Sequence, residues 1–221
     1  MNRGFFISVE GGEGAGKSIQ VEILASHLRE EGYHVVVTRE PGGTRIGEQI
    51  RSITHNPENV DLDPKTEAYL MAAARAQHVD EIIEPAIVAG KIVLCDRYVD
   101  SSIAYQGYGR KLGAQTIREL NELAINGAVA DLTVLLTVTP ATGLKRRSRS
   151  LKARDRLDLQ QKDFYDRVYQ GYLDLAKTYP TRYVVIDAGK SIEDVASEIW
   201  QVVRHKLNGR NGKKTNHSHT P

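Results

Sequence analysis

The residues with the clearest chemical signature are Gly11–Ser18, which read GGEGAGKS and fit the pattern G-x-x-x-x-G-K-[S/T]. Glycines let such a loop curl so that backbone N–H groups point inward, and the start of the following helix adds positive partial charge. Lys17 can reach the terminal phosphates of a nucleotide, and the Ser18 hydroxyl can bind Mg²⁺. The sequence therefore predicts a phosphate-binding loop, or P-loop, although a plain glycine turn before a helix remains an alternative.

Three further stretches each follow a strand-like run, where open α/β sheets bind their ligands. They read TREPGGT (38–44), DRYVDSSIAYQG (96–107) and KRRSRSLKARDRLD (145–158). Asp96 ends an apolar run, the position at which P-loop enzymes keep an acid that helps to hold Mg²⁺. Arg97 follows, and its guanidinium could clamp a phosphate through two hydrogen bonds. These stretches favour phosphoryl transfer over a generic nucleotide-binding loop.

In their order and spacing, these motifs resemble the thymidylate kinase family, of the bacterial type with lid arginines. The resemblance spans nearly the whole chain before residue 209. It implies an α/β fold with a five-stranded parallel sheet flanked by helices, the P-loop nucleoside monophosphate kinase fold with a lid. It also implies Mg²⁺-dependent transfer of the γ-phosphoryl group of ATP to dTMP, giving dTDP for dTTP synthesis.

The resemblance also implies roles for individual residues. For ATP binding they are Gly11, Gly12, Glu13, Gly14, Ala15, Gly16, Lys17 and Ser18; for dTMP binding they are Glu13, Glu40, Arg51, Met71, Arg75, Arg97, Ser102, Tyr105 and Gln106. Ser102 and Gln106 are expected at the thymine edge, and the Tyr105 ring is expected where it would crowd a 2′-hydroxyl. Met71 departs from the family, whose members usually carry a phenylalanine that stacks on the base. A thioether can also pack on a ring, but a simple core methionine is the alternative.

A lid is predicted at about residues 145–158, because seven of these fourteen residues are basic. The variable positions of the P-loop contain no arginine, so further catalytic positive charge must come from elsewhere. The expected catalytic residues are Lys17, Arg97, Arg154 and Arg156, with Ser18 and Asp96 as ligands of Mg²⁺. Arg147 and Arg149 are the next candidates for a catalytic arginine of the lid. The alternatives for this stretch are a solvated basic helix or a nucleic-acid contact.

Two other functions remain open on the motifs alone. Another P-loop nucleoside or nucleotide kinase shares most of these features, although a nucleoside kinase needs a base to deprotonate a hydroxyl. A P-loop switch module that binds nucleotide and signals is the alternative from a different class.

The elements that must position these motifs alternate in the manner of βαβ units with a parallel sheet. Strands are predicted at 5–10, 34–39, 91–96, 132–138 and 183–187. Helices are predicted at about 17–31, 63–90 with a kink at Pro85, 114–127, 141–150, 159–178 and 191–207.

Composition limits the remaining possibilities. The net charge is +2, and three cations (Arg210, Lys213 and Lys214) lie in the last thirteen residues, so residues 1–208 carry no basic excess for nucleic acid. We expect residues 1–208 to form a single P-loop kinase domain and residues 209–221 to form a disordered basic tail. No apolar run approaches the ~18 residues that span a bilayer, so no membrane partner is expected. The single Cys95 and the absence of a secretion-signal pattern favour a cytoplasmic location. The family resemblance suggests a homodimer.

Overall fold

The five predicted strands form one parallel sheet with the order β2-β3-β1-β4-β5. In the computed structural model, which describes residues 3–149 and 155–212, each strand lies within one residue of its predicted bounds. They are β1 (Phe5–Gly11), β2 (Val35–Arg39), β3 (Ile92–Asp96), β4 (Leu132–Thr137) and β5 (Tyr183–Asp187). β1 is buried along its whole length between β3 and β4. The predicted five-stranded parallel α/β fold is confirmed.

Helices connect the strands and cover both faces of the sheet. The α-helices are α1 (Lys17–Glu30), α2 (Arg45–His55), α3 (Pro64–His78), α4 (Glu84–Val88), α5 (Val99–Ser102), α6 (Ala114–Ile125), α7 (Pro140–Ser148), α8 (Lys162–Thr178) and α9 (Ile192–Gly212). Two π-helical segments, η1 (Val79–Ile83) and η2 (Ile103–Gly109), and one 3₁₀ turn, η3 (Leu157–Leu159), complete the described elements. Within this part of the chain, no helix is both long and apolar enough to cross a membrane.

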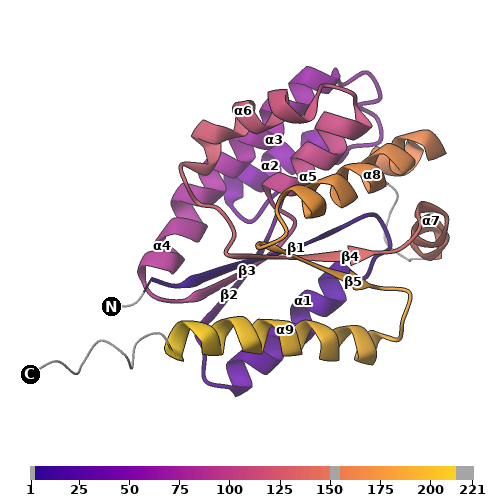
Figure 1. Ribbon diagram of the computed structural model, residues 1–221. Coiled ribbons are helices and arrows are strands. Elements are labelled where there is room, and N and C mark those ends of the chain that lie inside the picture. Colours follow the sequence, from indigo (N-terminus) through magenta and orange to yellow (C-terminus); the bar gives the residue numbers. More distant parts are fainter. Residues whose placement is uncertain (1–2, 150–154, 213–221) are drawn as a thin grey trace, which may run out of the picture.

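The helices form two unequal layers on the sheet (Figure 1). α1 and α9 lie on one face, and α3 to α6 and α8 lie on the other. Ile7 and Leu94 belong to the core beneath α1 and α9, whereas Phe6 and Val93 belong to the core on the opposite face. Because helices cover both faces, most strand residues are apolar whichever face they point to, which explains why the strands read as nearly continuous apolar runs. Ser8 and Glu10 of β1 are buried polar residues within these runs.

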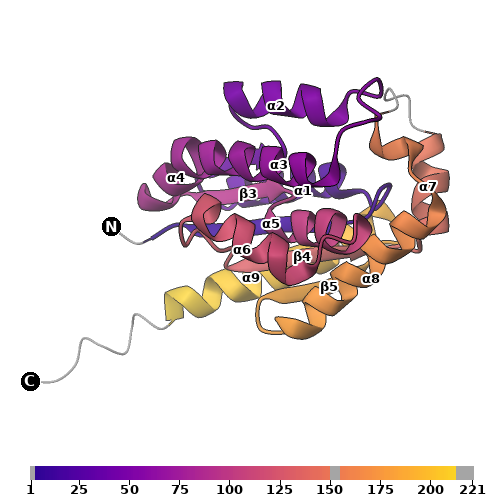
Figure 2. The same cartoon turned by 90° about the horizontal axis from the view of Figure 1, so that it is seen from above.

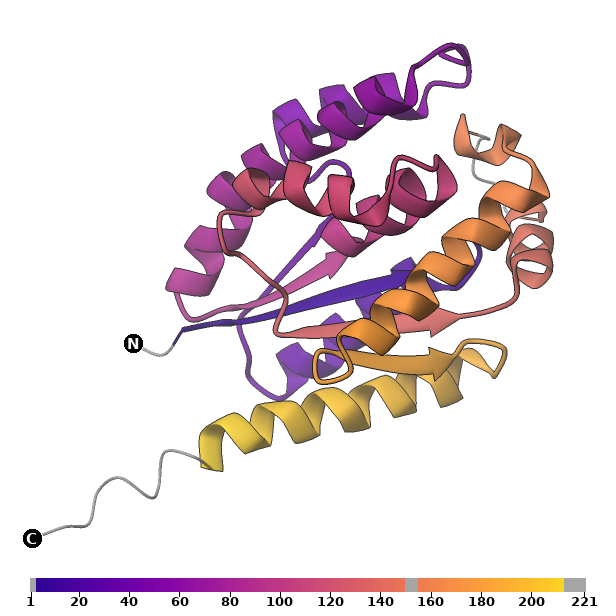
Figure 3. The ribbon, with the colours of Figure 1, turned by 45° about the horizontal axis from the view of Figure 1, so that its top comes forward.

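The carboxyl edge of the sheet gathers the loops that carry the motifs. α7 lies beyond the end of β4 at this edge (Figure 3). α2 lies farthest from the sheet, and its C-terminal end turns toward the segment that follows residue 154 (Figure 2). The backbone N–H of Arg156 donates to the carbonyl of His55 at 3.0 Å, which joins the two segments.

Two helical segments were absent from the predicted elements. Thr44 precedes α2, and its hydroxyl accepts a hydrogen bond from the Gly47 N–H at 2.9 Å and so caps the helix. The run from Val99 to Gly109 contains two glycines, which disfavour a helix locally, and its second part adopts the wider π geometry. Extensive packing of η2 against α8 holds this run in place.

Two predicted boundaries need correction. The predicted helix 63–90 changes to π geometry at Val79–Ile83, ahead of Pro85, which lacks an N–H and whose ring crowds the carbonyl one turn earlier. α9 continues to Gly212, past the predicted end at 207, because adding a residue to a formed helix is far easier than starting one. Residues 209–212 are therefore helical, and the rest of the predicted tail lies outside the described residues.

Candidate active site

The P-loop is the turn between β1 and α1. Gly14 has a φ of 65°, in the left-handed region that glycine adopts without steric cost. Lys17 begins α1, and its Nζ donates to the carbonyl oxygens of Gly11 and Gly12 at 3.1 and 2.8 Å. Burial and the nearby guanidinium of Arg97 lower the pKa of Lys17 to about 8. The loop therefore holds a buried amino group against the cavity that it lines.

Ser18 and Asp96, which come from different motifs, meet beside this loop. The Ser18 hydroxyl donates to Oδ2 of Asp96 at 2.6 Å, and both residues line the P-loop cavity. Hydroxyl and carboxylate oxygens are donors that suit Mg²⁺. Among the described residues, no group of three or more His, Cys, Asp and Glu side chains could hold a metal ion. This pair therefore fits an ion that takes its other ligands from phosphates and water.

Arg97 is fixed by its backbone and by its side chain. Its φ of 71° lies in the left-handed region, and its N–H donates to the Val9 carbonyl at 3.0 Å. Its guanidinium donates to Glu13 at 2.6 Å, to the Gly11 carbonyl at 3.0 Å and to the Tyr105 hydroxyl at 3.1 Å. A guanidinium with this many partners has little freedom to reorient, so its charge is preorganised.

Glu13 is the main anionic partner of Arg97. Burial alone would raise the pKa of Glu13, but the charges of Arg97 and Lys17 outweigh it and lower the pKa to about 2. The hydroxyl of Tyr105 also donates to Glu13, at 2.8 Å. The carboxylate in the P-loop is thus compensated by two cations, which explains how an anion can sit within a phosphate-binding loop.

A second carboxyl group, Glu10, lies behind Arg97. It accepts hydrogen bonds from the Tyr98 N–H at 2.7 Å, from the Ser101 hydroxyl at 2.6 Å and from the Tyr172 hydroxyl at 3.2 Å. Arg97 in turn donates to the hydroxyls of Ser101 and Tyr172 at 3.3 and 3.2 Å. Burial, followed by the charge of Asp100, raises the pKa of Glu10 to about 8. Glu10 therefore supports Arg97 through shared hydroxyl groups.

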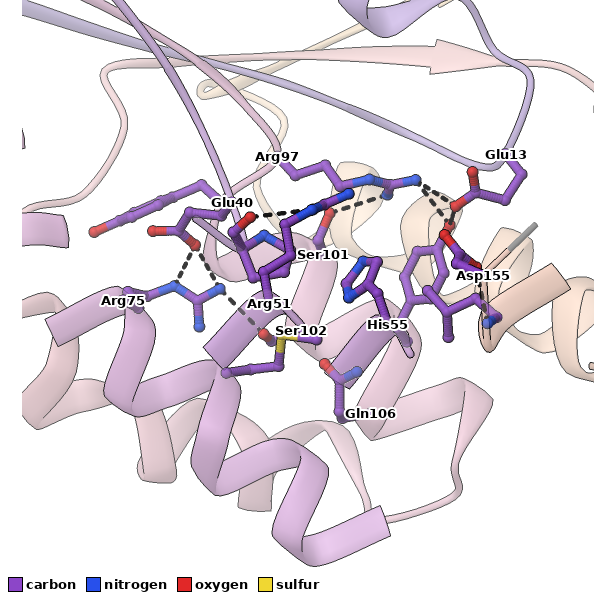
Figure 4. A pocket seen from close by; sticks show the side chains of 15 residues that line it. Glu13, Glu40, Arg51, His55, Arg75, Arg97, Ser101, Ser102, Gln106 and Asp155 are labelled. Carbon is purple, nitrogen blue, oxygen red and sulfur yellow. Dashed lines mark hydrogen bonds and ion pairs between the residues drawn. The ribbon is translucent and has the colours of Figure 1, made fainter. Parts of the chain in front are cut away.

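Arg75 forms part of the wall of a neighbouring pocket. Its Nε donates to Glu40 at 2.8 Å and its Nη2 donates to the Ser102 hydroxyl at 3.1 Å, as Figure 4 shows. The other oxygen of Glu40 lies 2.9 Å from Nδ1 of His78. Both oxygens of Glu40 are therefore engaged with side chains of α3, and Glu40 orients Arg75.

The rest of this pocket is built by α3, α5 and η2. Met71 is only 9% exposed and lies on the same wall as Arg75, one helical turn away. Gln106 lies across the pocket from Arg97 (Figure 4). Tyr105 and Ser102 also line the pocket. The five residues expected around a base and its sugar are thus brought together, and Met71 is part of the pocket wall.

The two cavities adjoin each other and share part of their lining. The residues that line both are Glu13, Glu40, Arg51, His55, Arg97 and Asp155. Arg51 donates to the Pro41 carbonyl at 3.1 Å. A group held near Arg97 is therefore accessible both from the P-loop side and from the Arg75 side.

Comparisons with known proteins agree with this geometry. The model of the thymidylate kinase family matches residues 9–199. The chain belongs to the thymidylate kinase family. A thymidylate kinase of Geobacillus thermodenitrificans is 49% identical over 207 residues, which cover 93% of this chain and 92% of the relative. A thymidylate kinase of Halalkalibacterium halodurans is 47% identical over 208 residues, covering 94% and 99%. The crystal structure of thymidylate kinase from Ehrlichia chaffeensis superposes with a TM-score of 0.75 at 35% identity, covering 91% of this chain and 99% of that chain.

Family membership confirms the resemblance drawn from the motifs, but one expected lid residue lies elsewhere. Arg156 was expected to be catalytic, yet it is 3% exposed and lines neither cavity. Its guanidinium pairs with Glu67 and donates to the Thr54 carbonyl at 2.9 Å. The buried carboxylate of Glu67 attracts this arginine away from the P-loop cavity. Arg154 lies outside the described residues.

The described arginines of the predicted lid that line the P-loop cavity come from α7. Arg146 and Arg147 line it, and Arg147 pairs with Asp158 through contacts of 3.0 and 2.6 Å. The Arg146 guanidinium donates to the Ala188 carbonyl at 2.8 Å. The basic residues of 145–158 indicated this region in the sequence, but only the fold shows which of its arginines line the P-loop cavity.

His55 is a site residue that the sequence did not indicate. It lines both cavities at the C-terminal end of α2. Burial and the charges of Arg51 and Arg97 lower its pKa to about 3, so the imidazole is neutral near pH 7. No motif surrounds His55 in the sequence, and its helix was itself not predicted.

Proposed function

We propose that the chain transfers the γ-phosphoryl group of ATP to dTMP, giving ADP and dTDP. The observation that carries this proposal is that the two cavities adjoin, with Arg97 lining both and Lys17 on the P-loop side. ATP is assigned to the P-loop cavity and dTMP to the pocket of Arg75 and Gln106. The γ-phosphate and the acceptor phosphate would then meet beside Arg97.

The chemistry follows from charge and position. The acceptor is an ionised 5′-phosphate, so its oxygen can attack without a strong general base. Charge that spreads over the transferred group in the transition state is stabilised by preorganised cations. Lys17 and Arg97 provide two such cations, and Arg147 of α7 is a third candidate because it lines the same cavity.

Mg²⁺ is proposed to bind at the Ser18 and Asp96 oxygens together with the phosphates of ATP. When bound, it supplies further neutralisation of phosphate charge. The 2.6 Å contact between these two side chains places both oxygens at one point of the cavity. Replacing either side chain should weaken the binding of Mg²⁺, so that more Mg²⁺ is needed for activity, without disturbing the distant base pocket.

The remaining site assignments rest on the pocket wall. Arg51 is assigned to the acceptor phosphate, since it lines both cavities. Met71 is assigned to the face of the base, and Tyr105 to the sugar, with its hydroxyl held by Glu13. We also infer that residues 1–208 form one kinase domain in which about 145–158 act as a lid that excludes water.

A homodimer is proposed on the family resemblance, with helices at its interface. Exposed apolar side chains on three neighbouring helices are candidates for burial between copies: Ile53 on α2, Tyr69 on α3 and Leu123 on α6, which are 44%, 64% and 90% exposed. Sedimentation of the full chain tests this proposal. A monomer at micromolar concentration would contradict it.

The activity is tested by measuring ADP release with Mg-ATP over a panel of nucleosides and nucleoside monophosphates. We expect the fastest turnover with dTMP and little ADP release without an acceptor. Turnover of thymidine without turnover of dTMP would instead support a nucleoside kinase.

A further inference from the structure

Glu67 of α3 is a buried carboxylate placed directly behind the base pocket. Its exposed fraction is 0%, and it is not among the residues that line the pocket. The Nε2 of Gln106 donates to Glu67 Oε1 at 2.7 Å. Arg156 Nη2 pairs with Glu67 Oε2, and Arg110 Nη2 lies 3.1 Å from the same oxygen. The proposed reaction uses neither Glu67 nor these two arginines.

The contact with Glu67 determines which atom of Gln106 faces the pocket. A carboxylate only accepts hydrogen bonds, so the carboxamide atom facing Glu67 must be the NH₂ group. The carbonyl oxygen of Gln106 is then the other atom, and nothing in the described part of the chain donates a hydrogen bond to it. Gln106 therefore presents an acceptor to whatever occupies the pocket, which it lines.

An acceptor at this position distinguishes between pyrimidines. Thymine and uracil carry a hydrogen at N3, whereas cytosine carries a lone pair there and an amino group at C4. An acceptor oxygen complements the N3–H of thymine and uracil and repels the N3 lone pair of cytosine. Arg75, a pure donor on the same pocket wall, complements a C4 carbonyl and opposes an amino group.

We propose that Glu67 is a positioning residue that locks Gln106 in the acceptor orientation and thereby sets the preference for thymine over cytosine. This proposal rests on the assignment of dTMP to this pocket. Two guanidinium groups compensate the charge of Glu67, so that it remains an acceptor for Gln106. Arg156 then contributes to the same base specificity, because it is buried against Glu67 and helps to hold this carboxylate toward Gln106.

The test is the isosteric variant Glu67→Gln, measured with dTMP and dCMP as acceptors. The amide introduced at position 67 can donate as well as accept, so Gln106 is free to turn its NH₂ toward the base. We expect KM for dTMP to rise about tenfold with kcat nearly unchanged, and the ratio of kcat/KM for dTMP over dCMP to fall at least about tenfold. An unchanged ratio in the folded variant would overturn the proposal.

A rescue experiment separates positioning from mere structural support. In the double variant Glu67→Gln with Gln106→Glu, the carboxylate at position 106 offers an acceptor in either orientation and can accept from the amide at position 67. The preference for dTMP should return. A double variant that is no more selective than Glu67→Gln alone would contradict the orientation argument.

The control is Asp131→Asn, at the opposite end of the sheet. Asp131 also pairs with an arginine, Arg3, at 2.7 Å and accepts from the Phe6 N–H at 2.8 Å. This variant should lower thermal stability without changing the dTMP to dCMP ratio. If it changes the ratio as much as Glu67→Gln does, selectivity follows stability and the proposal is refuted.

If Glu67→Gln does not fold, Arg156→Gln tests the same inference. Without the Arg156 guanidinium, the Glu67 carboxylate loses a partner that holds it in place and can turn away from Gln106. A positioning role therefore predicts a higher KM for dTMP and lower selectivity with kcat retained. A catalytic lid role for Arg156 predicts instead a loss of kcat of about 10³-fold or more, which would overturn the proposal. Failure of the unmodified protein to phosphorylate dTMP would refute the proposed function itself and is thus distinct from each of these outcomes.

Discussion

Replacing Arg97 by alanine removes one of the two arginines that, in the described part of the chain, line both cavities. Removing an arginine that stabilises a transferring phosphoryl group costs about 10³ to 10⁵ in rate, or roughly 4–7 kcal/mol of transition-state stabilisation. Lys17 remains in the phosphate cavity and Arg51 in both. We therefore expect a loss near the lower end, about 10³-fold in kcat.

The backbone at Arg97 provides a second variant that separates the side chain from the fold. A non-glycine residue in the left-handed region costs about 1 kcal/mol or more, and Arg97 has a φ of 71°. Arg97→Gly should therefore be about 1 kcal/mol more stable to unfolding than Arg97→Ala, yet just as inactive. If activity followed stability, the glycine variant would instead be the more active of the two.

The assay combines steady-state ADP release with calorimetric titration of ATP and unfolding in urea. ATP binding should change only a few-fold, because Lys17 and the P-loop backbone are intact. A kcat within tenfold of the unmodified protein for Arg97→Ala would refute the reasoning that places Arg97 at the transferred group.

Three other perturbations follow from the site. Because the pKa of Lys17 is lowered to about 8, the unliganded protein loses this positive charge as the pH rises through 8. The value of kcat/KM for ATP should then fall about tenfold per pH unit above pH 8. A flat pH profile up to about pH 10 would contradict this expectation. Met71→Phe should tighten dTMP binding severalfold if position 71 faces the base, as calorimetry can show, whereas unchanged affinity with lower stability would mark a purely packing role. Glu40→Gln leaves Arg75 without its buried anionic partner. The KM for dTMP should therefore rise about tenfold or more, while the affinity for ATP is retained. An unchanged KM for dTMP would show that Arg75 does not need Glu40 for its orientation.

Much of this site was predictable because its chemistry is encoded in contiguous motifs. The P-loop combines glycines, a lysine and a serine within eight residues, and their roles depend on local backbone geometry. The apolar runs predicted every strand, since a parallel strand covered on both faces is mostly apolar, even though β1 also buries Ser8 and Glu10. Asp96 and Arg97 could be placed near the P-loop because the carboxyl ends of parallel strands share one edge.

Other features depended on contacts between segments far apart in the chain. His55 enters the site only because α2 packs beside α3 and ends at the cavities. Arg156 resembles its basic neighbours in the sequence, but a buried carboxylate 89 residues away determines where it points. Likewise, no local pattern shows that Glu67 faces Gln106 rather than solvent.

The sequence by itself determined the fold class and the P-loop, because these depend on local backbone preferences and on the periodicity of apolar residues, and the resemblance of its motifs indicated the family. The tertiary structure decided which of several similar side chains face the nucleotide cavities and which orient their neighbours. A charged side chain turns toward whichever opposite charge the packed elements bring within reach, and this choice exists only once distant segments have come together.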